Sequence, residues 1–174
     1  ISQGQYADFL NKLTPSQAGY RYPNYYGTNR YTITSNENVY AAGAPDRACV
    51  WLSWADGAAY SDWAGLRPMT ELEYEKACRG FAPTAPDELA WGNTTIVGIT
   101  NFFGADGSGT ETADPVNANC NYFNSIDTGP IFGPVRCGIF ATAVSGRIAA
   151  GATYWGIMEM SGNLRERVVT VGNE

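Results

Sequence analysis

The sequence predicts a mixed α+β fold with few helices, short strands and long ordered loops. Its 174 residues suit one domain, and Ser/Thr-x-x-Gln/Glu capping patterns mark the starts of a few short helices. By contrast, residues 81–137 are rich in Gly, Asn, Thr, Pro and Asp and lack a helical period. So long an irregular stretch is usually functional, or is held by disulfides or ions. We treat residues 1–174 as a single domain, incomplete at both ends, because the chain begins with Ile1 inside a helix pattern.

The first predicted helix begins at the chain's start. Ser2 and Gln5 have capping-box spacing. Apolar residues then recur with helical spacing until Thr14-Pro15 ends the pattern. The apolar stripe consists of Tyr6, Phe9, Leu10 and Leu13.

Two more helices are predicted close together in the middle of the chain. Ser53 with Asp56 caps the second, which a glycine closes. Thr70 with Glu73 caps the third, which spans 71–79 and ends at the next glycine.

Four short segments have the composition of strands. Residues 30–34 form a candidate strand within an aromatic, turn-rich segment, and residues 50–52 read as a short buried strand. Residues 155–158 and 168–171 read as late strands.

The composition excludes several classes of function. The chain contains no histidine, so it offers no Ser-His-Asp or Cys-His catalytic group and no imidazole-ligated metal site. A net charge of −6 argues against nucleic acid or an anionic membrane as a partner. The apolar runs are too short for membrane insertion as a helix.

The cysteines form an even set of four: Cys49, Cys78, Cys120 and Cys137. They permit two disulfides in three connectivities, and the alternative is four buried free thiols. There is no zinc-type spacing. A chain with 11 tyrosines and only two lysines, Lys12 and Lys76, suits a secreted or cell-surface protein.

Several motifs occur in one order along most of the chain. They are SQGQYADFLN at 2–11, LSWADGAAYSDWAGLRPMTELEYEKACRG at 52–80, AWGN at 90–93, ANCN at 118–121, GPV at 133–135 and GIMEMSGNLRE at 156–166. Together they resemble the formylglycine-generating enzyme family, also called the sulfatase-modifying factor domain. The resemblance implies a variant of the C-type lectin fold, in which calcium ions hold irregular loops.

The resemblance implies a first calcium site around the SGN turn. Its ligands would be the side chains of Glu159 and Glu166 and the carbonyl oxygens of Gly162 and Leu164. Calcium prefers such mixed carboxylate and carbonyl oxygens. Glu159 stands where the family usually has Asp or Asn. The alternative is a turn whose two glutamates are merely solvated.

A second implied calcium site would use the Asn119 side chain, the Cys120 carbonyl, Asp127 and the Gly129 carbonyl. The alternative is an ordinary loop rich in Asn and Asp. Residues 104–114 also have the composition of a calcium loop, but there a solvated loop is the preferred interpretation.

The match to the family's catalytic residues fails. The family's oxidases convert a substrate cysteine to formylglycine with copper held by two cysteines downstream of the SGN turn. None of the four cysteines here matches those positions, and the chain stops at Glu174. Arg165 and Arg167 stand where the family usually has Trp, which indicates an altered surface or one covered by a partner. A related iron-dependent branch is excluded because its ligands are histidines.

The resemblance also bears on the disulfides. Cys78 matches a family cysteine whose partner lies in the C-terminal part beyond residue 174, which leaves its partner here open. The strand before LSW packs near the helix ending in ACRG in the family fold, so Cys49–Cys78 is an expected pair. Cys120–Cys137 would then staple the second calcium loop.

We therefore expect a non-catalytic extracellular module, stabilised by calcium and used for structural or binding contacts. Its partners would be protein or glycan at the cell surface, and oligomeric assembly stays open. One alternative is a formylglycine-generating oxidase whose catalytic cysteines and copper lie beyond residue 174. Another is a variable ligand-display domain on the same fold.

Overall fold

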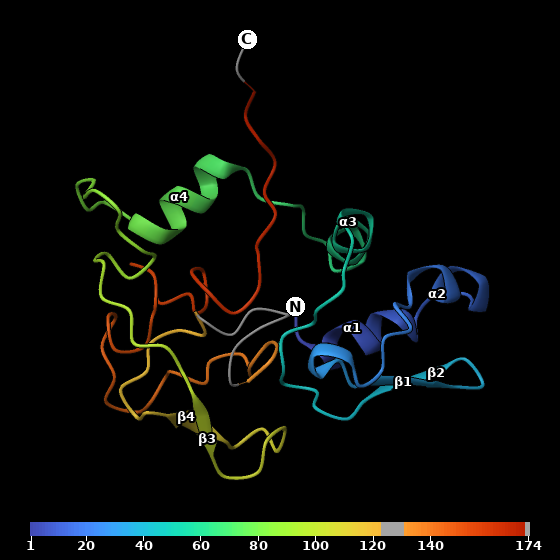
Figure 1. Ribbon diagram of the computed structural model, residues 1–174. Helices are drawn as coiled ribbons and strands as arrows, with labels where there is room; N and C mark the ends of the chain where they lie inside the picture. Colours follow the sequence, from blue (N-terminus) through green and yellow to red (C-terminus); the bar gives the residue numbers. More distant parts are fainter. Residues whose placement is uncertain (123–130, 173–174) are drawn as a thin grey trace.

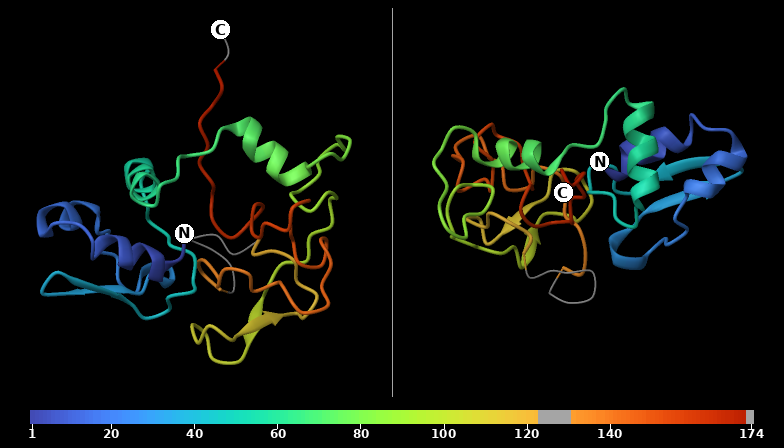
Figure 2. Two further views of the ribbon diagram at one scale, coloured as in Figure 1. Left: turned by 180° about the vertical axis from the view of Figure 1, so that it is seen from behind. Right: turned by 90° about the horizontal axis from the view of Figure 1, so that it is seen from above.

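A computed structural model describes residues 1–122 and 131–172 as two halves that meet near the N-terminus (Figure 1). The N-terminal half contains α1 (Gln3–Leu10), α2 (Pro15–Arg21), a short 3₁₀ turn (Thr28–Arg30), β1 (Ile33–Asn36), β2 (Val39–Ala42) and α3 (Trp54–Trp63). The C-terminal half contains α4 (Glu71–Arg79), β3 (Asn101–Phe103) and β4 (Thr112–Asp114) among long loops. Views from behind and from above show the same two halves (Figure 2). The expected α+β class with few helices and short strands is confirmed.

The predicted capping box of α1 is confirmed. Ser2 Oγ accepts from the Gln5 N–H at 3.2 Å, and Gln5 Oε1 accepts from the Ser2 N–H at 2.9 Å. The helix ends at Leu10, one turn earlier than the stripe suggested. Its buried face forms the N-terminal core with the tyrosines of the following segments. The fully buried members are Tyr6, Phe9, Leu10, Tyr31 and Ile33.

A second helix, α2, was not predicted. Thr14-Pro15 ends the first helix pattern but also begins another, because proline at the first helical position has no N–H to leave unpaired. Thr14 and Gln17 complete a capping box of their own. The sequence signal was therefore present and was interpreted only as a stop.

The expected strands at 30–34 and 50–52 differ from the structure. The first becomes β1, which begins only at Ile33 because Arg30 has a φ of +65°. It pairs antiparallel with β2, with Ile33 opposite Ala42. Residues 50–52 form no strand: Val50 is buried, but Trp51 has a φ of +69°, which strand geometry does not allow.

Both helices predicted in the middle of the chain are confirmed with their caps. Ser53 and Asp56 form the capping box of α3, and Thr70 and Glu73 form that of α4. At the end of α4 the backbone turns at Gly80 with a φ of +66°. A Cβ atom there would overlap the ring of Tyr154, so this position requires glycine.

The two late strands are not formed. Residues 153–157 make a tight turn, in which the Thr153 N–H donates to the Ile157 carbonyl at 2.9 Å and Gly156 has a φ of +80°. Val169 forms a single parallel bridge with Thr70, because α4 begins at the next residue and removes the strand partner. The hairpin of β3 and β4 was not predicted, since each strand has three residues and the segment shows no clear alternation.

Two small apolar clusters form the core of the C-terminal half. One gathers around Val135, Ile99 and Phe140. The other gathers around Trp91, Cys120 and Met160. Most of the chain around these clusters is loop, so backbone groups there depend on side-chain partners and on short loop-to-loop bridges.

Candidate metal centre at the turn of residues 160–163

The turn of residues 160–163, here called the SGN turn, is where four of the quoted motifs meet. Ser161 Oγ accepts from the Ala90 N–H at 3.0 Å. The Asn163 N–H donates to the Asn121 carbonyl at 2.9 Å, and Asn163 Oδ1 accepts from the Val135 N–H at 2.8 Å. Segments separated by tens of residues are therefore joined through this one turn.

The backbone of the turn is left-handed at three positions. Glu159, Gly162 and Asn163 have φ values of +57°, +95° and +63°. A Cβ at Gly162 would lie 3.1 Å from the Asn121 carbonyl oxygen, so glycine fits best there. Asn and Asp tolerate this conformation better than Glu does. The backbone therefore holds Glu159 in a conformation that glutamate rarely adopts.

Two carboxylates flank the turn. Glu159 is half-buried and its Oε1 accepts from the Gly138 N–H at 2.7 Å, yet burial still raises the pKa of this carboxyl. Glu166 is exposed as a residue, but protein atoms crowd its carboxyl group. That crowding, with a smaller contribution from the Glu159 charge, raises the pKa of Glu166 to about 7. The two carboxylates thus lack sufficient positive charge from the protein.

The remaining expected ligands are the carbonyl oxygens of Gly162 and Leu164. No residue that the structure describes donates a hydrogen bond to either of them. Two under-compensated carboxylates that flank such a turn have the chemistry to bind a hard cation such as calcium. Within residues 1–122 and 131–172, no three His, Cys, Asp or Glu side chains form a metal cluster. An ion at the SGN turn would therefore depend on carbonyl and water oxygens as well.

Asn121, which the sequence analysis missed, is part of the same arrangement. It is buried, and its amide donates to Gly133 O at 3.1 Å and to Asn163 Oδ1 at 3.3 Å. Its own side-chain oxygen is buried without a donor among the described residues. In the sequence, Asn121 is visible only as the second Asn of the ANCN motif. The sequence separation between Asn121 and Asn163 gives no sign that the two residues are in contact.

The described part of the second expected site serves loop-to-loop pairing. Asn119 Oδ1 accepts from the Val97 N–H at 2.9 Å, and its amide donates to Thr95 O at 3.1 Å and Ile148 O at 3.3 Å. The Cys120 carbonyl accepts from the Ile99 N–H at 2.9 Å. The other two expected ligands, Asp127 and Gly129, lie outside the described residues. Calcium binding there stays a prediction.

In the candidate calcium loop at residues 104–114, arginines neutralise the central aspartate. Asp106 pairs with Arg30 at 2.7 Å and with Arg47 at 2.9 Å. Glu111 is fully buried and accepts from the Gly107 N–H at 3.3 Å. A cation is therefore not needed to hold this loop.

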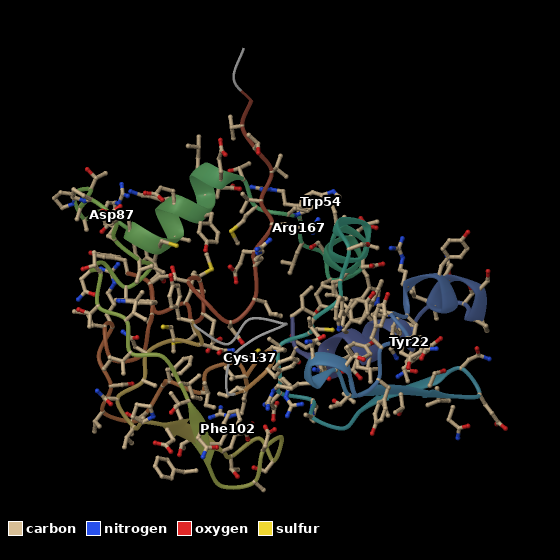
Figure 3. The ribbon with its side chains drawn as sticks, in the orientation of Figure 1. Tyr22, Trp54, Asp87, Phe102, Cys137 and Arg167 are labelled. Carbon is tan, nitrogen blue, oxygen red and sulfur yellow. The ribbon has the colours of Figure 1, made fainter. Side chains whose placement is uncertain are left out.

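All four cysteines are free thiols, so neither expected pair, Cys49–Cys78 or Cys120–Cys137, is formed in this structure. Burial raises the pKa of Cys49 to about 12 and those of Cys78 and Cys120 to about 11. Cys137 is the exposed one and lies near the meeting of the two halves (Figure 3). Its N–H donates to the Asp46 carbonyl at 2.9 Å across that junction.

Arg165 and Arg167 are both exposed. They lie on the extended segment that leads away from the SGN turn toward the C-terminus, where Arg167 is labelled in Figure 3. The two guanidinium groups thus form part of the molecular surface.

The sequence is similar to one family of known proteins. A family model described as "Sulfatase-modifying factor enzyme 1-like domain" matches residues 1–171. No solved structure matches significantly.

Three formylglycine-generating enzymes are similar over shorter segments. The enzyme of Streptomyces coelicolor is 43% identical over 56 residues, which cover 32% of this chain and 17% of the relative. That of Thermomonospora curvata is 45% identical over 49 residues, covering 28% and 16%, and that of Bos taurus is 50% identical over 49 residues, covering 28% and 13%. The aligned segments thus span less than a fifth of each relative. Because the family model extends over nearly all of its residues, the chain belongs to the sulfatase-modifying factor domain family.

Proposed function

We propose that this chain is a calcium-stabilised, non-catalytic module that acts by contact outside the cell. The observation that carries the proposal is the interacting pair of under-compensated carboxylates, Glu159 and Glu166, which flank a turn whose Gly162 and Leu164 carbonyls have no donor among the described residues. A bound calcium ion would supply the missing positive charge. Because several segments hydrogen-bond to the SGN turn, an ion there would stabilise the C-terminal half as a whole.

The thiols support a role without copper chemistry for this chain. Copper(I) is soft and binds thiolates. Burial raises the pKa values of Cys49, Cys78 and Cys120 to about 11 or 12, which disfavours the thiolate form that copper(I) binds. The exposed arginines at 165 and 167 also give the surface after the turn a different chemistry from the aromatic one that the resemblance implies.

An extracellular location is supported by the tyrosine-rich, lysine-poor composition. Several tyrosines lie on the surface of the N-terminal half, where they offer area for contact: Tyr20, Tyr25 and Tyr26. Among the described residues, every helix is too short or too polar to cross a membrane.

Thermal unfolding with and without calcium tests the proposal. Calcium at a hundredfold excess over its Kd should stabilise the folded chain by about 2.7 kcal/mol and raise the melting temperature. Glu166→Gln removes the charge that the ion needs, so calcium should no longer raise its melting temperature. Glu37→Gln, in the hairpin turn of the other half, is the matched control and should respond as the wild type does. If Glu166→Gln and wild type respond equally, the site is absent.

A second candidate is copper-dependent formylglycine generation by a longer protein, with the copper-binding cysteines outside residues 1–174. The names of the three similar enzymes favour it. Incubating the longer protein with copper(I), oxygen, a thiol reductant and a cysteine peptide of the sulfatase type discriminates the two by mass spectrometry. The proposal expects an unchanged peptide, whereas conversion of its cysteine to the aldehyde would overturn the non-catalytic role.

A further inference from the structure

Three aromatic side chains form an exposed cluster where α4 ends. Phe81 is 73% exposed, Trp155 54% and Tyr154 45%. Their ring centroids lie 5.0 to 6.1 Å apart in edge-to-face arrangements. We call these three residues the aromatic patch. An exposed apolar cluster of this kind on a soluble domain commonly marks a binding surface.

Hydrogen bonds and packing hold the aromatic patch in place. Thr153 Oγ1 accepts from the Trp155 N–H at 3.3 Å and the Ile157 N–H at 3.0 Å. The indole N–H of Trp155 donates to the Lys76 carbonyl at 3.3 Å. Gly80, without a Cβ, lets the Tyr154 ring lie directly on the helix end. The rings therefore lose little conformational entropy when a ligand binds.

Two cations lie over these rings. The Lys76 ammonium is 4.4 Å from the Phe81 ring centroid, and the Arg147 guanidinium is 5.7 Å from that of Tyr154. Neither cation forms an ion pair with a residue that the structure describes. In a chain with a net charge of −6, this is a local excess of positive charge.

Nearby carboxylates cancel this excess only in part, because Glu75 and Glu88 share the single charge of Arg79. Lys76 is exposed and remains available to an anionic group of a ligand. The Arg147 guanidinium donates to the Cys78 and Ala90 carbonyls at 3.0 Å each, so it adds positive charge from a fixed position.

The backbone at the patch offers no edge for a peptide strand. The N–H groups of residues 154–157 are all used internally: Tyr154 donates to Cys78 O, Gly156 to Thr153 O, and the other two to Thr153 Oγ1. Three partly exposed rings also supply only a few hundred Å² at about 150–250 Å² per ring. A stable protein interface needs about 800 Å² per partner. Recognition here must use ring faces and cations on a small ligand unit.

We propose that the aromatic patch binds acidic sugar units of a glycan. The C–H groups on one face of a pyranose carry partial positive charge, which the negative faces of aromatic rings attract. A uronic-acid carboxylate would lie near Lys76 and Arg147. The inference deepens the proposed contact role by giving its ligand class, and it does not depend on the calcium site.

Affinity electrophoresis of the whole chain in gels with hyaluronan, a glucuronic-acid polymer, tests this proposal. Wild type should be retarded despite its negative charge, and added salt should reduce the retardation. Trp155→Ala combined with Phe81→Ala should weaken binding about tenfold, and Lys76→Gln should weaken it while reducing the salt dependence. Phe103→Ala, which removes a 50% exposed ring of β3, is the matched control and should bind as wild type.

The gels include dextran, a neutral glycan, and polyglutamate, an acidic polymer without sugar rings. Retardation by dextran equal to that by hyaluronan, or by polyglutamate alone, would overturn the ligand class. Unchanged mobility of wild type in hyaluronan, or equal binding by the double variant, would overturn the site. Circular dichroism of each variant checks that it is folded. The runs are repeated with calcium and with chelator. If the calcium proposal fails, glycan binding can then still be judged separately from it.

Discussion

Asn163 and Asn121 hold each other through two hydrogen bonds. The Asn163 N–H donates to the Asn121 carbonyl at 2.9 Å, and the Asn121 amide donates to Asn163 Oδ1 at 3.3 Å. Asn163 Oδ1 also accepts a hydrogen bond from the N–H of the fully buried Val135. One left-handed asparagine thus joins the turn to two other segments.

Replacing Asn163 should lower the stability of the folded chain. Asn163→Ala leaves the Val135 N–H buried without its acceptor and puts alanine at a φ of +63°. The free energy of unfolding should fall by about 2–4 kcal/mol, measured by urea denaturation. Asn163→Gly loses the same hydrogen bonds but tolerates the backbone, so its loss should be about 1 kcal/mol smaller. Wild-type stability in both variants would contradict this role of the side chain.

Glu159 should have opposite effects with and without calcium. Glu159→Gln keeps the shape and the acceptor for the Gly138 N–H but removes a charge that burial disfavours. In chelator the variant should therefore melt above wild type. In saturating calcium it should melt below wild type, because a ligand charge is lost. The same order of melting temperatures in both buffers would argue against an ion at this residue.

Two glycines should differ sharply in their tolerance of alanine. At Gly151 the φ is +60°, and an added Cβ would overlap the carbonyl oxygen of Asn119. Gly151→Ala should destabilise by about 2 kcal/mol or more. Gly19 lies inside α2 with nothing within 4 Å of an added Cβ, so Gly19→Ala should stabilise by up to about 1 kcal/mol. Chemical denaturation compares the pair, and similar values would mean that the close approach at Gly151 is absent.

The thiols should react unequally in the native chain. Iodoacetamide at pH 8 should modify Cys137 first and Cys49 and Cys120 far more slowly, because Cys137 is exposed and the other two are buried. Burial raises the pKa values of all three thiols, to about 12 for Cys49 and about 11 for Cys120. Cys137→Ser should remove the fast phase. Four reactive thiols are expected after denaturation without reductant. A smaller number would instead show that disulfides form.

The stability that Glu73 gives to the start of α4 should depend on pH. Its carboxylate bonds to the Arg67 guanidinium and accepts from the Thr70 N–H at 2.8 Å, and these partners lower its pKa from 4.5 to about 2. A lowered folded pKa contributes stability that is fully present above about pH 4.5 and is lost as the pH falls through about 2. The difference in melting temperature between wild type and Glu73→Gln should therefore shrink between pH 5 and 2. A constant difference would rule out this titration.

Helices α1, α3 and α4 could be predicted because their start signals are local. Ser2, Ser53 and Thr70 each bond to a residue three positions later, and this spacing is visible in the sequence. The late strands failed for the opposite reason. Whether Val169 extends into a ladder depends on what lies beside it, and the adjacent chain begins α4 at Glu71.

The calcium site at the SGN turn stays a prediction. The ligand positions around the SGN turn came from the resemblance to the family, and the raised pKa values of Glu159 and Glu166 agree with an ion site there. Bonds to Asn121 and Val135 could not be foreseen, since they join segments whose distance in sequence carries no signal. The aromatic patch could not be predicted for the same reason, because Phe81 and Trp155 lie far apart in the chain.

The hydrogen bonds that end at the SGN turn also set an order of events during synthesis. They span 28, 42 and 71 residues, and all of them need residues 161–163. The N-terminal half can bury its aromatic core as soon as α3 has left the ribosome. The groups of Ala90, Asn121 and Val135 that bond to the turn must wait for residues 161–163, so the nascent chain carries them unpaired until those residues have left the ribosome. Proteases and chaperones therefore encounter a nascent chain in which the N-terminal half can fold before the C-terminal half.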